Sequence, residues 1–209
     1  MNDYRWIEEY GKARRRLFIR VRNMEAHKKA VSALPHEEIL DLAVTCHVFL
    51  EESLRGISSC TVTEDLRGEY GVTAAELIRD ATDNAASLCG WQIRPMTEMS
   101  AYLTGEDAPA LQEGAEEVLV ITNRKMLYGA AAVFYPGVAP EIASRLQGSY
   151  FLLPSSVHEM IAVPAKDHDP AYLSQMVRTI NRTVVDTGDR LSDHVYLYDT
   201  ETGTFVIAD

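Results

Sequence analysis

Cysteine is scarce in this sequence. The 209 residues include three cysteines, Cys46, Cys60 and Cys89, and no two of them form a CxxC pair. An odd and scattered set of this kind argues against a disulfide framework and against a cysteine zinc site. We interpret the three cysteines as buried free thiols of a protein that resides in the reducing cytoplasm.

Long hydrophobic runs are also missing. A helix needs roughly 18 apolar residues to cross a bilayer, whereas the longest runs here, near Val44–Leu50 and Ala130–Tyr135, have the length of strands. The first residues, Met1–Trp6, lack a basic segment followed by an apolar one and so do not resemble a signal peptide. We therefore expect a cytoplasmic protein without membrane contact.

The common signatures of cofactor and metal sites are absent from the sequence. It contains no Walker loop, no GxGxxG turn, no HExxH pair and no GxSxG nucleophile elbow. These absences remove the best-marked nucleotide, zinc and serine-hydrolase classes. We expect no cofactor and no bound metal.

Positive charge is scarce outside the N-terminus. Residues 1–30 hold nine Lys or Arg against four acids, whereas residues 31–209 hold 11 basic and 27 acidic residues. Nucleic-acid binding depends on neutralising phosphates, so an acidic body disfavours it. The hydrophobic share of 46% is that of a folded chain, long enough for one large domain or two small ones.

The basic N-terminus carries an apolar pattern with helical spacing. This spacing predicts an amphipathic basic helix over roughly residues 3–30, within a segment 1–32. Its apolar stripe needs a surface, which is either the body of the same chain or another subunit, so self-association or a protein partner at this helix is expected. The stripe consists of Trp6, Tyr10, Ala13, Leu17, Val21 and Met24.

A second unit, expected over residues 33–103, combines a hairpin with helices. Alternating apolar residues within Ile39–Leu50 favour a strand, although a buried helix is the alternative for so apolar a run. The runs Ile39–Leu50 and Ile57–Thr63 together predict a hairpin. Thr73 and Glu76 match a capping box at the start of a helix that ends near Gly90, preceded by a short helix over 64–70.

The third unit is predicted to follow a small, acidic and turn-rich linker over residues 104–116. Residues 117–209 then read as a ββαββαββ domain, with strands joined by links too short for parallel pairing. The predicted class is α+β with a mainly antiparallel sheet. The expected elements are strands Val118–Thr122, Gly129–Tyr135, Tyr150–Leu153, Met160–Val163, Val195–Tyr198 and Thr204–Ile207, a helix from Pro140 to before Gly148, and a helix capped by Asp169 with Pro170 at its first position.

The densest polar cluster lies between two of these strands, at Pro154–Glu159. A serine nucleophile needs a base and an orienting acid, and Ser155, Ser156, His158 and Glu159 supply all three types. The alternatives are a role in binding a ligand or partner, and a β-turn whose serine hydroxyls bond nearby backbone amides.

A second polar pair, Asp193 and His194, precedes a predicted strand. It could join His158 and Glu159 in a metal or acid–base site if the fold brings them together. The alternative is a capped loop that ends in a histidine at the start of the strand.

Several segments resemble a bacterial family of unknown function, DUF5688, found in Clostridia such as Lachnospiraceae. The resembling segments are Leu119–Asn123 followed by Leu127–Ala131, Tyr135–Val138, Leu152–Glu159, Met176–Arg178 with Asn181, and Leu191–Tyr196 with Asp199. Members of the family extend further at the N-terminus, so the chain resembles a short form. The family brings no agreed activity, and the resemblance only directs attention to Asn123, Tyr135, Asn181 and Asp193 as contacts for a ligand or partner.

Three hypotheses for function follow. The first is a non-enzymatic cytoplasmic protein that binds a partner as a regulatory or accessory factor. The second is a hydrolase that uses Ser155 or Ser156 with His158 or His194. The third is an acidic inhibitor that mimics nucleic acid on a basic enzyme, which requires the 27 acids of residues 31–209 to gather on one face.

Overall fold

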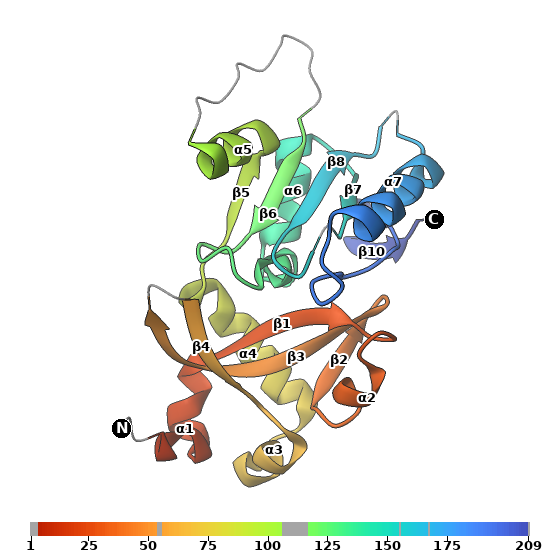
Figure 1. Cartoon of the computed structure of the whole chain (residues 1–209). Helices are drawn as coiled ribbons and strands as arrows, with labels where there is room; N and C mark the ends of the chain where they lie inside the picture. The colour runs from red at the N-terminus through yellow and green to blue at the C-terminus, as the bar shows by residue number, and fades with distance from the viewer. Residues whose placement is uncertain (1–3, 54–55, 106–116, 155, 167, 209) are drawn as a thin grey trace.

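Two antiparallel sheets divide the molecule into two lobes, as Figure 1 shows. The structure is a computed structural model that describes residues 4–53, 56–105, 117–154, 156–166 and 168–208. The class is α+β, as predicted. The first lobe contains η1 (Arg5–Glu8), α1 (Tyr10–Ala13), η2 (Arg14–Arg16), β1 (Leu17–Asn23), α2 (Lys28–Val31), β2 (His36–Ile39), β3 (Leu42–Ser53), β4 (Gly56–Thr61), α3 (Glu64–Tyr70) and α4 (Ala74–Leu88).

The second lobe is built on a six-stranded sheet with strand order β10-β9-β7-β8-β6-β5. Every neighbouring pair in it is antiparallel. The lobe contains β5 (Gln92–Pro95), α5 (Met96–Thr104), β6 (Leu119–Thr122), η3 (Gly129–Phe134), α6 (Val138–Leu146), β7 (Tyr150–Leu153), β8 (Met160–Pro164), α7 (Pro170–Thr183), β9 (Tyr196–Asp199) and β10 (Thr204–Ile207).

The prediction of one helix over residues 3–30 is wrong. Short helical turns end at Arg16, and β1 follows, paired with β3. Leu17 and Val21 fit helical spacing, but with Ile19 they also alternate along a strand, and all three are buried in the core. The two periods coincide over these few residues, and packing on α4 and pairing with β3 decide in favour of the strand.

The apolar side chains before β1 pack on the same chain. Trp6, Ile7 and Tyr10 contact the main core, and the Tyr70 hydroxyl donates to the Ile7 carbonyl at 2.6 Å. Tyr10 and Tyr70 also bring their rings to 5.1 Å between centroids. Of the two surfaces proposed for the N-terminal stripe, the body of the chain is therefore the one that these residues use.

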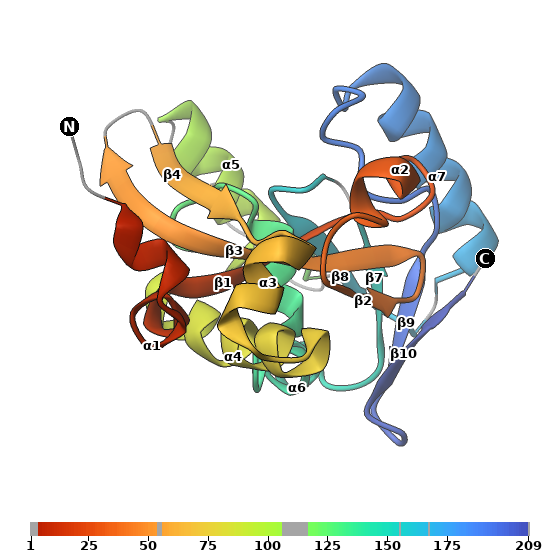
Figure 2. The same cartoon turned by 90° about the horizontal axis from the view of Figure 1, so that it is seen from below.

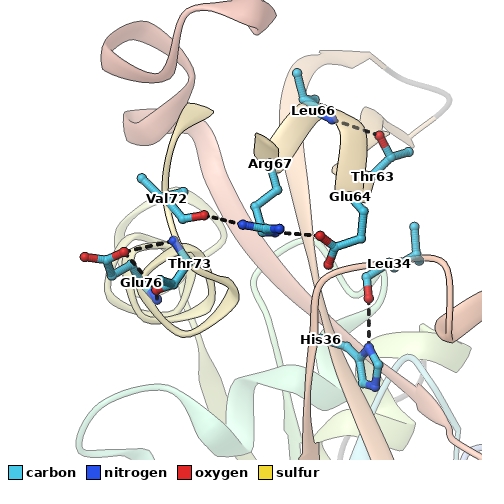
Figure 3. Close-up of polar contacts among 9 residues, drawn as sticks. All are labelled: Leu34, His36, Thr63, Glu64, Leu66, Arg67, Val72, Thr73 and Glu76. Atoms are coloured by element: carbon cyan, nitrogen blue, oxygen red, sulfur yellow. Dashed lines mark hydrogen bonds and ion pairs between the residues drawn. The ribbon is translucent and has the colours of Figure 1, made fainter. Parts of the chain in front are cut away.

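The hairpin and the two helices that follow it, α3 and α4, agree with the sequence predictions. β3 and β4 pair antiparallel, as predicted, with a register shift between Phe49 and Glu51. Figure 3 shows the predicted capping box, in which the Glu76 carboxylate accepts from the Thr73 amide at 2.9 Å and the Thr73 hydroxyl accepts from the Glu76 amide at 3.2 Å. Arg67 secures the turn before it by donating to Val72 O at 2.6 Å. These hydrogen bonds thus fix the start of α4. They join Arg67, Val72, Thr73 and Glu76.

The prediction of a strand over Gly129–Tyr135 is also wrong. This segment forms η3, a buried 3-10 helix between the two sheets. Its small side chains allow close approach, since a Cβ on Gly129 would lie 2.1 Å from Thr122 Oγ1 and 2.6 Å from His158 O. A run of alanines has strand-like hydrophobicity but no bulk, so it fills a narrow space as a tight helix. The ββαββαββ order is corrected accordingly.

The domain limits drawn from the sequence differ from the sheets. Strand β5 precedes the predicted linker, yet it forms an edge of the second sheet by pairing with β6. The six-stranded sheet therefore needs a strand from outside the predicted domain 117–209, namely β5. Most of the linker 104–116 lies outside the described residues.

One main core joins the lobes. Leu119, Leu152 and Tyr196 on one face of the second sheet share a continuous cluster with Leu17 and Leu77 of the first lobe. The other face of the second sheet is covered by α7, which packs on a smaller cluster formed by Phe151, Leu153, Val163, Leu173, Val177 and Val195. Figure 2 shows α7 on the side of the molecule opposite α1.

Candidate functional site

The loop between β7 and β8 has the geometry of a closed turn. The Ser156 hydroxyl donates to Glu159 Oε1 at 2.9 Å and accepts from the His158 amide at 3.0 Å. Ser156 is only 6% exposed. This is the turn that the sequence offered as the alternative to a nucleophile. Ser155, the other predicted serine, lies outside the described residues.

The imidazole of His158 is engaged away from Ser156. Its Nδ1 accepts from the Tyr128 amide at 3.1 Å, so the neutral ring carries its proton on Nε2. Nε2 faces Asp189, 3.6 Å from its carboxylate oxygen. A serine hydrolase needs the imidazole against the serine oxygen, and here both ring nitrogens face other groups. The geometry of the described residues therefore does not favour a Ser156–His158 pair.

Tyr128 connects this loop with the first lobe. Its ring lies 5.5 Å from the His158 ring and 3.6 Å from the Arg20 guanidinium on β1. Burial lowers the pKa of Arg20, and the Tyr128 ring together with a 2.7 Å hydrogen bond to Ser59 supports the cation. Nothing in the sequence pattern marked Arg20 or Tyr128 as neighbours of the predicted site.

Asn123 is a turn residue. It is 2% exposed. Its side-chain Nδ2 donates to Leu127 O at 2.8 Å, and its side-chain Oδ1 accepts from the Lys125 backbone amide at 3.0 Å. Tyr135 is equally buried, and burial together with Cys89 raises the pKa of its hydroxyl. These contacts hold both side chains inside the protein, so neither is placed to reach a ligand at the surface.

The second predicted group lines a pocket at the junction of the lobes. Asp193 and His194 face a hollow of about 580 Å³, which also involves Asn23, Met24, Glu25, Ala26, Asp41, Thr187, Arg190, Leu191 and Ser192. Asn181, 1% exposed, orients the pocket wall by donating to Asp193 Oδ1 and to Ser192 O at 2.8 Å each.

Asp41 reaches this pocket from the first lobe. Its carboxylate accepts from the Ser192 hydroxyl at 2.7 Å and from the Tyr196 hydroxyl at 2.5 Å. Ser192 in turn accepts from the His194 amide at 3.0 Å. Residues 41 and 192 are 151 positions apart, so no local motif in the sequence could identify this contact.

The two predicted groups are adjacent. The Val157 amide donates to Asp189 O at 2.9 Å, and Asp189 also faces His158. The loop of Ser156 therefore contacts the segment that leads to Asp193. Ser156 bonds Glu159 within its own turn and Asp193 accepts from Asn181, so these contacts form two neighbouring polar networks.

Among the residues that the structure describes, no three His, Cys, Asp or Glu side chains gather closely enough to hold a metal ion. Among the same residues, no helix has the length and apolar character required for a membrane span.

Comparison with known proteins gives a family and no activity. A search of curated proteins and a search of solved structures each return no significant match. A family model, described as a family of unknown function (DUF5688), matches residues 1–200. This match covers nearly all of the 209 residues. The chain therefore belongs to the DUF5688 family.

Proposed function

We propose that this protein is a cytoplasmic binding or accessory factor that docks a protein partner along the outer side of helix α7. A line of exposed apolar side chains on that helix carries the proposal. Tyr172, Ile180 and Val184 are 65%, 38% and 76% exposed, and Met176 lies partly buried between them. Their spacing of four residues places Tyr172, Met176 and Ile180 on one side of the helix, and Val184 follows as its C-cap.

The neighbouring side of α7 is weakly polar. The hydroxyls of Thr179 and Thr183 donate to the carbonyls of Gln175 and Thr179, both at 2.8 Å. These hydroxyls are satisfied by the helix backbone, which leaves the methyl groups to the outer surface. The apolar line (Tyr172, Met176, Ile180 and Val184) is thereby extended by two methyl groups.

Charge indicates the kind of partner. Helix α7 contains Arg178 and Arg182 and no acidic residue, although the chain holds 31 acids. An apolar groove with an acidic rim complements this surface, in the manner of helix-in-groove recognition. A symmetric pair of copies would bring the arginines of two α7 helices together, so a different protein is the better fit.

The N-terminal segment, predicted from the sequence as the binding element, is a weaker choice. Trp6, Ile7 and Tyr10 already pack against the core of their own chain. Exposing them for a partner would cost the contacts that they make there. The cytoplasm is proposed as the compartment because Cys46, Cys60 and Cys89 are free thiols.

The test uses site-specific crosslinking. A photoreactive residue at position 180 should capture one protein from a lysate of the source organism, and the same residue at position 102, on α5, should not. Affinity for the purified protein should then fall at least about tenfold in Ile180→Asp/Val184→Asp, which removes buried apolar contacts. Leu103→Asp, at an equally exposed apolar site on α5, is the control and should bind normally.

Two outcomes would count against the proposal. One is equal loss of affinity in the Leu103 variant, which would show a nonspecific effect of added charge. The other is a stable homodimer in native mass spectrometry that the α7 variant separates into monomers, which would make α7 a self-association surface.

A further inference from the structure

Two arginines flank a hollow beside the edge strand β5. Arg94, on β5, and Arg124, just after β6, line two adjoining pockets of about 370 and 400 Å³ and share them with Gln92. The chain has 31 acidic and 20 basic residues, so carboxylates that could pair with an arginine are in excess. Across the described ranges, neither guanidinium forms an ion pair with a carboxylate, and Arg94 lies over the Tyr102 ring, 5.6 Å from its centroid.

The backbone is shaped to hold Arg124 at this position. Gly90 has a φ of +63°, and a Cβ on it would lie 2.6 Å from Arg124 Cδ and 2.8 Å from Nε. The Arg124 side chain therefore lies directly against a residue that only glycine suits well. The side chain of Gln92, which lines both pockets, is held in place because its Nε2 donates to Asn123 O at 3.3 Å.

A third arginine, Arg145, has a structural role at the second pocket. Arg145 lines the second pocket, but it donates to Ile93 O at 3.0 Å and pairs with Glu141 at 2.9 Å. Its charge is neutralised and its position is set by α6 and β5. Among the residues that the structure describes, no carboxylate pairs with Arg94 or Arg124, so their positive charge faces the pocket.

Beyond the two arginines and Gln92, the walls of the first pocket are formed by larger, mainly apolar side chains. Met99, Tyr102 and Met126 complete the lining. Guanidinium groups bind phosphate oxygens through paired hydrogen bonds, and sulfur and aromatic side chains favour contact with a flat ring. A volume of about 370 Å³ is in the range of small-molecule sites.

We propose that Arg94 and Arg124 form a binding site for a small organic phosphate that carries an aromatic ring. The phosphate lies between the two guanidinium groups, and the ring lies against Met99, Tyr102 and Met126. This site is separate from the apolar line on α7, so its test does not depend on the proposed partner.

The experiment is a calorimetric titration of the whole protein at constant ionic strength. The probes are phenyl phosphate, inorganic phosphate and benzoate. Phenyl phosphate should bind several-fold more tightly than inorganic phosphate because the ring adds apolar contact. Arg94→Gln and Arg124→Gln should each weaken phenyl phosphate binding about tenfold or more, as expected for loss of a charged hydrogen-bond donor. Gly90→Ala should weaken it as well, by displacing Arg124.

Arg15→Gln, which removes an exposed arginine on η2, is the matched control and should leave the affinity unchanged. Circular dichroism on every variant establishes that it is folded. Equal weakening in Arg15→Gln, or unchanged binding in Arg94→Gln and Arg124→Gln, would overturn the site. Binding of benzoate as tight as that of phenyl phosphate would overturn the assignment of a phosphate, and absence of saturable binding of any probe at millimolar concentration would overturn the proposal as a whole.

Discussion

His47 is a neutral histidine enclosed in the first sheet. It is 1% exposed, with Thr45 Oγ1 at 3.1 Å from Nε2 and Thr61 Oγ1 at 3.3 Å from Nδ1. Burial, and after it the charges of Arg20 and Arg22, hold the pKa of His47 well below its ordinary value. The folded protein therefore excludes a proton that the unfolded chain binds below about pH 6.5.

This difference predicts how stability changes with pH. Below about pH 6.5 the unfolded state binds more protons at this residue, so stability falls with decreasing pH by up to about 1.4 kcal/mol per pH unit. Urea unfolding at pH 7, 6 and 5 measures the slope in wild type and in His47→Gln. The variant should lose this part of the slope, whatever its stability at pH 7. Parallel slopes in the two proteins would contradict the prediction.

Position 129 requires glycine because neighbouring atoms leave no room for a side chain, and not because its backbone has a positive φ. A Cβ there would lie 2.6 Å from the Asn123 amide and 2.1 Å from Thr122 Oγ1. Gly129→Ala should lower the free energy of unfolding by about 1–3 kcal/mol or more, because η3 must move away from β6. Gly68, inside α3, has open space around its Cα. Gly68→Ala is therefore the control and should stabilise the protein by about 0.5–1 kcal/mol in the same denaturation experiment. Similar losses in the two variants would mean that the close contact at η3 relaxes without cost.

At the scale of elements, one carboxylate holds the N-terminal turns on α4. Asp80, 8% exposed, accepts from the Tyr10 hydroxyl at 2.5 Å and pairs with Arg14 at 2.8 Å. Burial acts to raise the pKa of Asp80, but the hydrogen bonds from Tyr10 and Arg14 outweigh it and lower the pKa. A lowered carboxyl pKa contributes stability above the unfolded value of about 3.9 and loses it as pH falls through the folded value.

Asp80→Asn should therefore destabilise the protein at pH 7 by about 1–2 kcal/mol, a modest amount because the Arg14 side of the pair is screened by solvent. The gap between wild type and variant should narrow as pH falls below about 4 and through the lowered folded-state pKa of Asp80, where the wild-type carboxylate becomes protonated. Asp83→Asn, on an exposed position of the same helix, is the control for charge. Thermal unfolding over a series of pH values from about 7 down to about 2 provides the measurement, and a gap of constant size over that series would argue against an ionised Asp80.

The elements predicted correctly are those whose signals are local. The capping box at Thr73, the Asp169–Pro170 start of α7 and the short links between strands depend on a few neighbouring residues. The failures occurred where local patterns are ambiguous. Residues 17–21 satisfy two periods, and the alanines of η3 satisfy the hydrophobicity of a strand without its bulk.

The candidate site shows the same division. Ser156 and Asp193 could be selected from the sequence because polar residues between apolar strands stand out. Their partners could not, since contacts such as Asp41 with Ser192 arise only when two sheets from distant parts of the chain pack together. Arg94 and Arg124, which pair with no carboxylate among the described residues, could not be selected either, because the sequence does not show which arginines form ion pairs.

At the scale of the whole molecule, polar contacts at the junction fix the lobes against each other. In Figure 1 the segment between α7 and β9 descends to the first lobe, where Asn23 donates to Leu191 O at 3.0 Å. Asp41 binds both Ser192 and Tyr196 beside it. These bonds surround the largest of the pockets described above, so they determine its shape.

Removing the Asp41 carboxylate should weaken this junction. Asp41→Ala leaves two partly buried hydroxyls without their acceptor, and the free energy of unfolding should fall by about 1–3 kcal/mol. Hydrogen exchange should increase in β9 and around residues 40–45, with little change in α4, because the loss is confined to the junction. Glu38→Ala, which removes an exposed carboxylate from β2, controls for charge and should change neither quantity. A double-mutant cycle with Ser192→Ala then isolates the bond, and a coupling free energy near zero would show that the Asp41–Ser192 bond does not help to hold the lobes together.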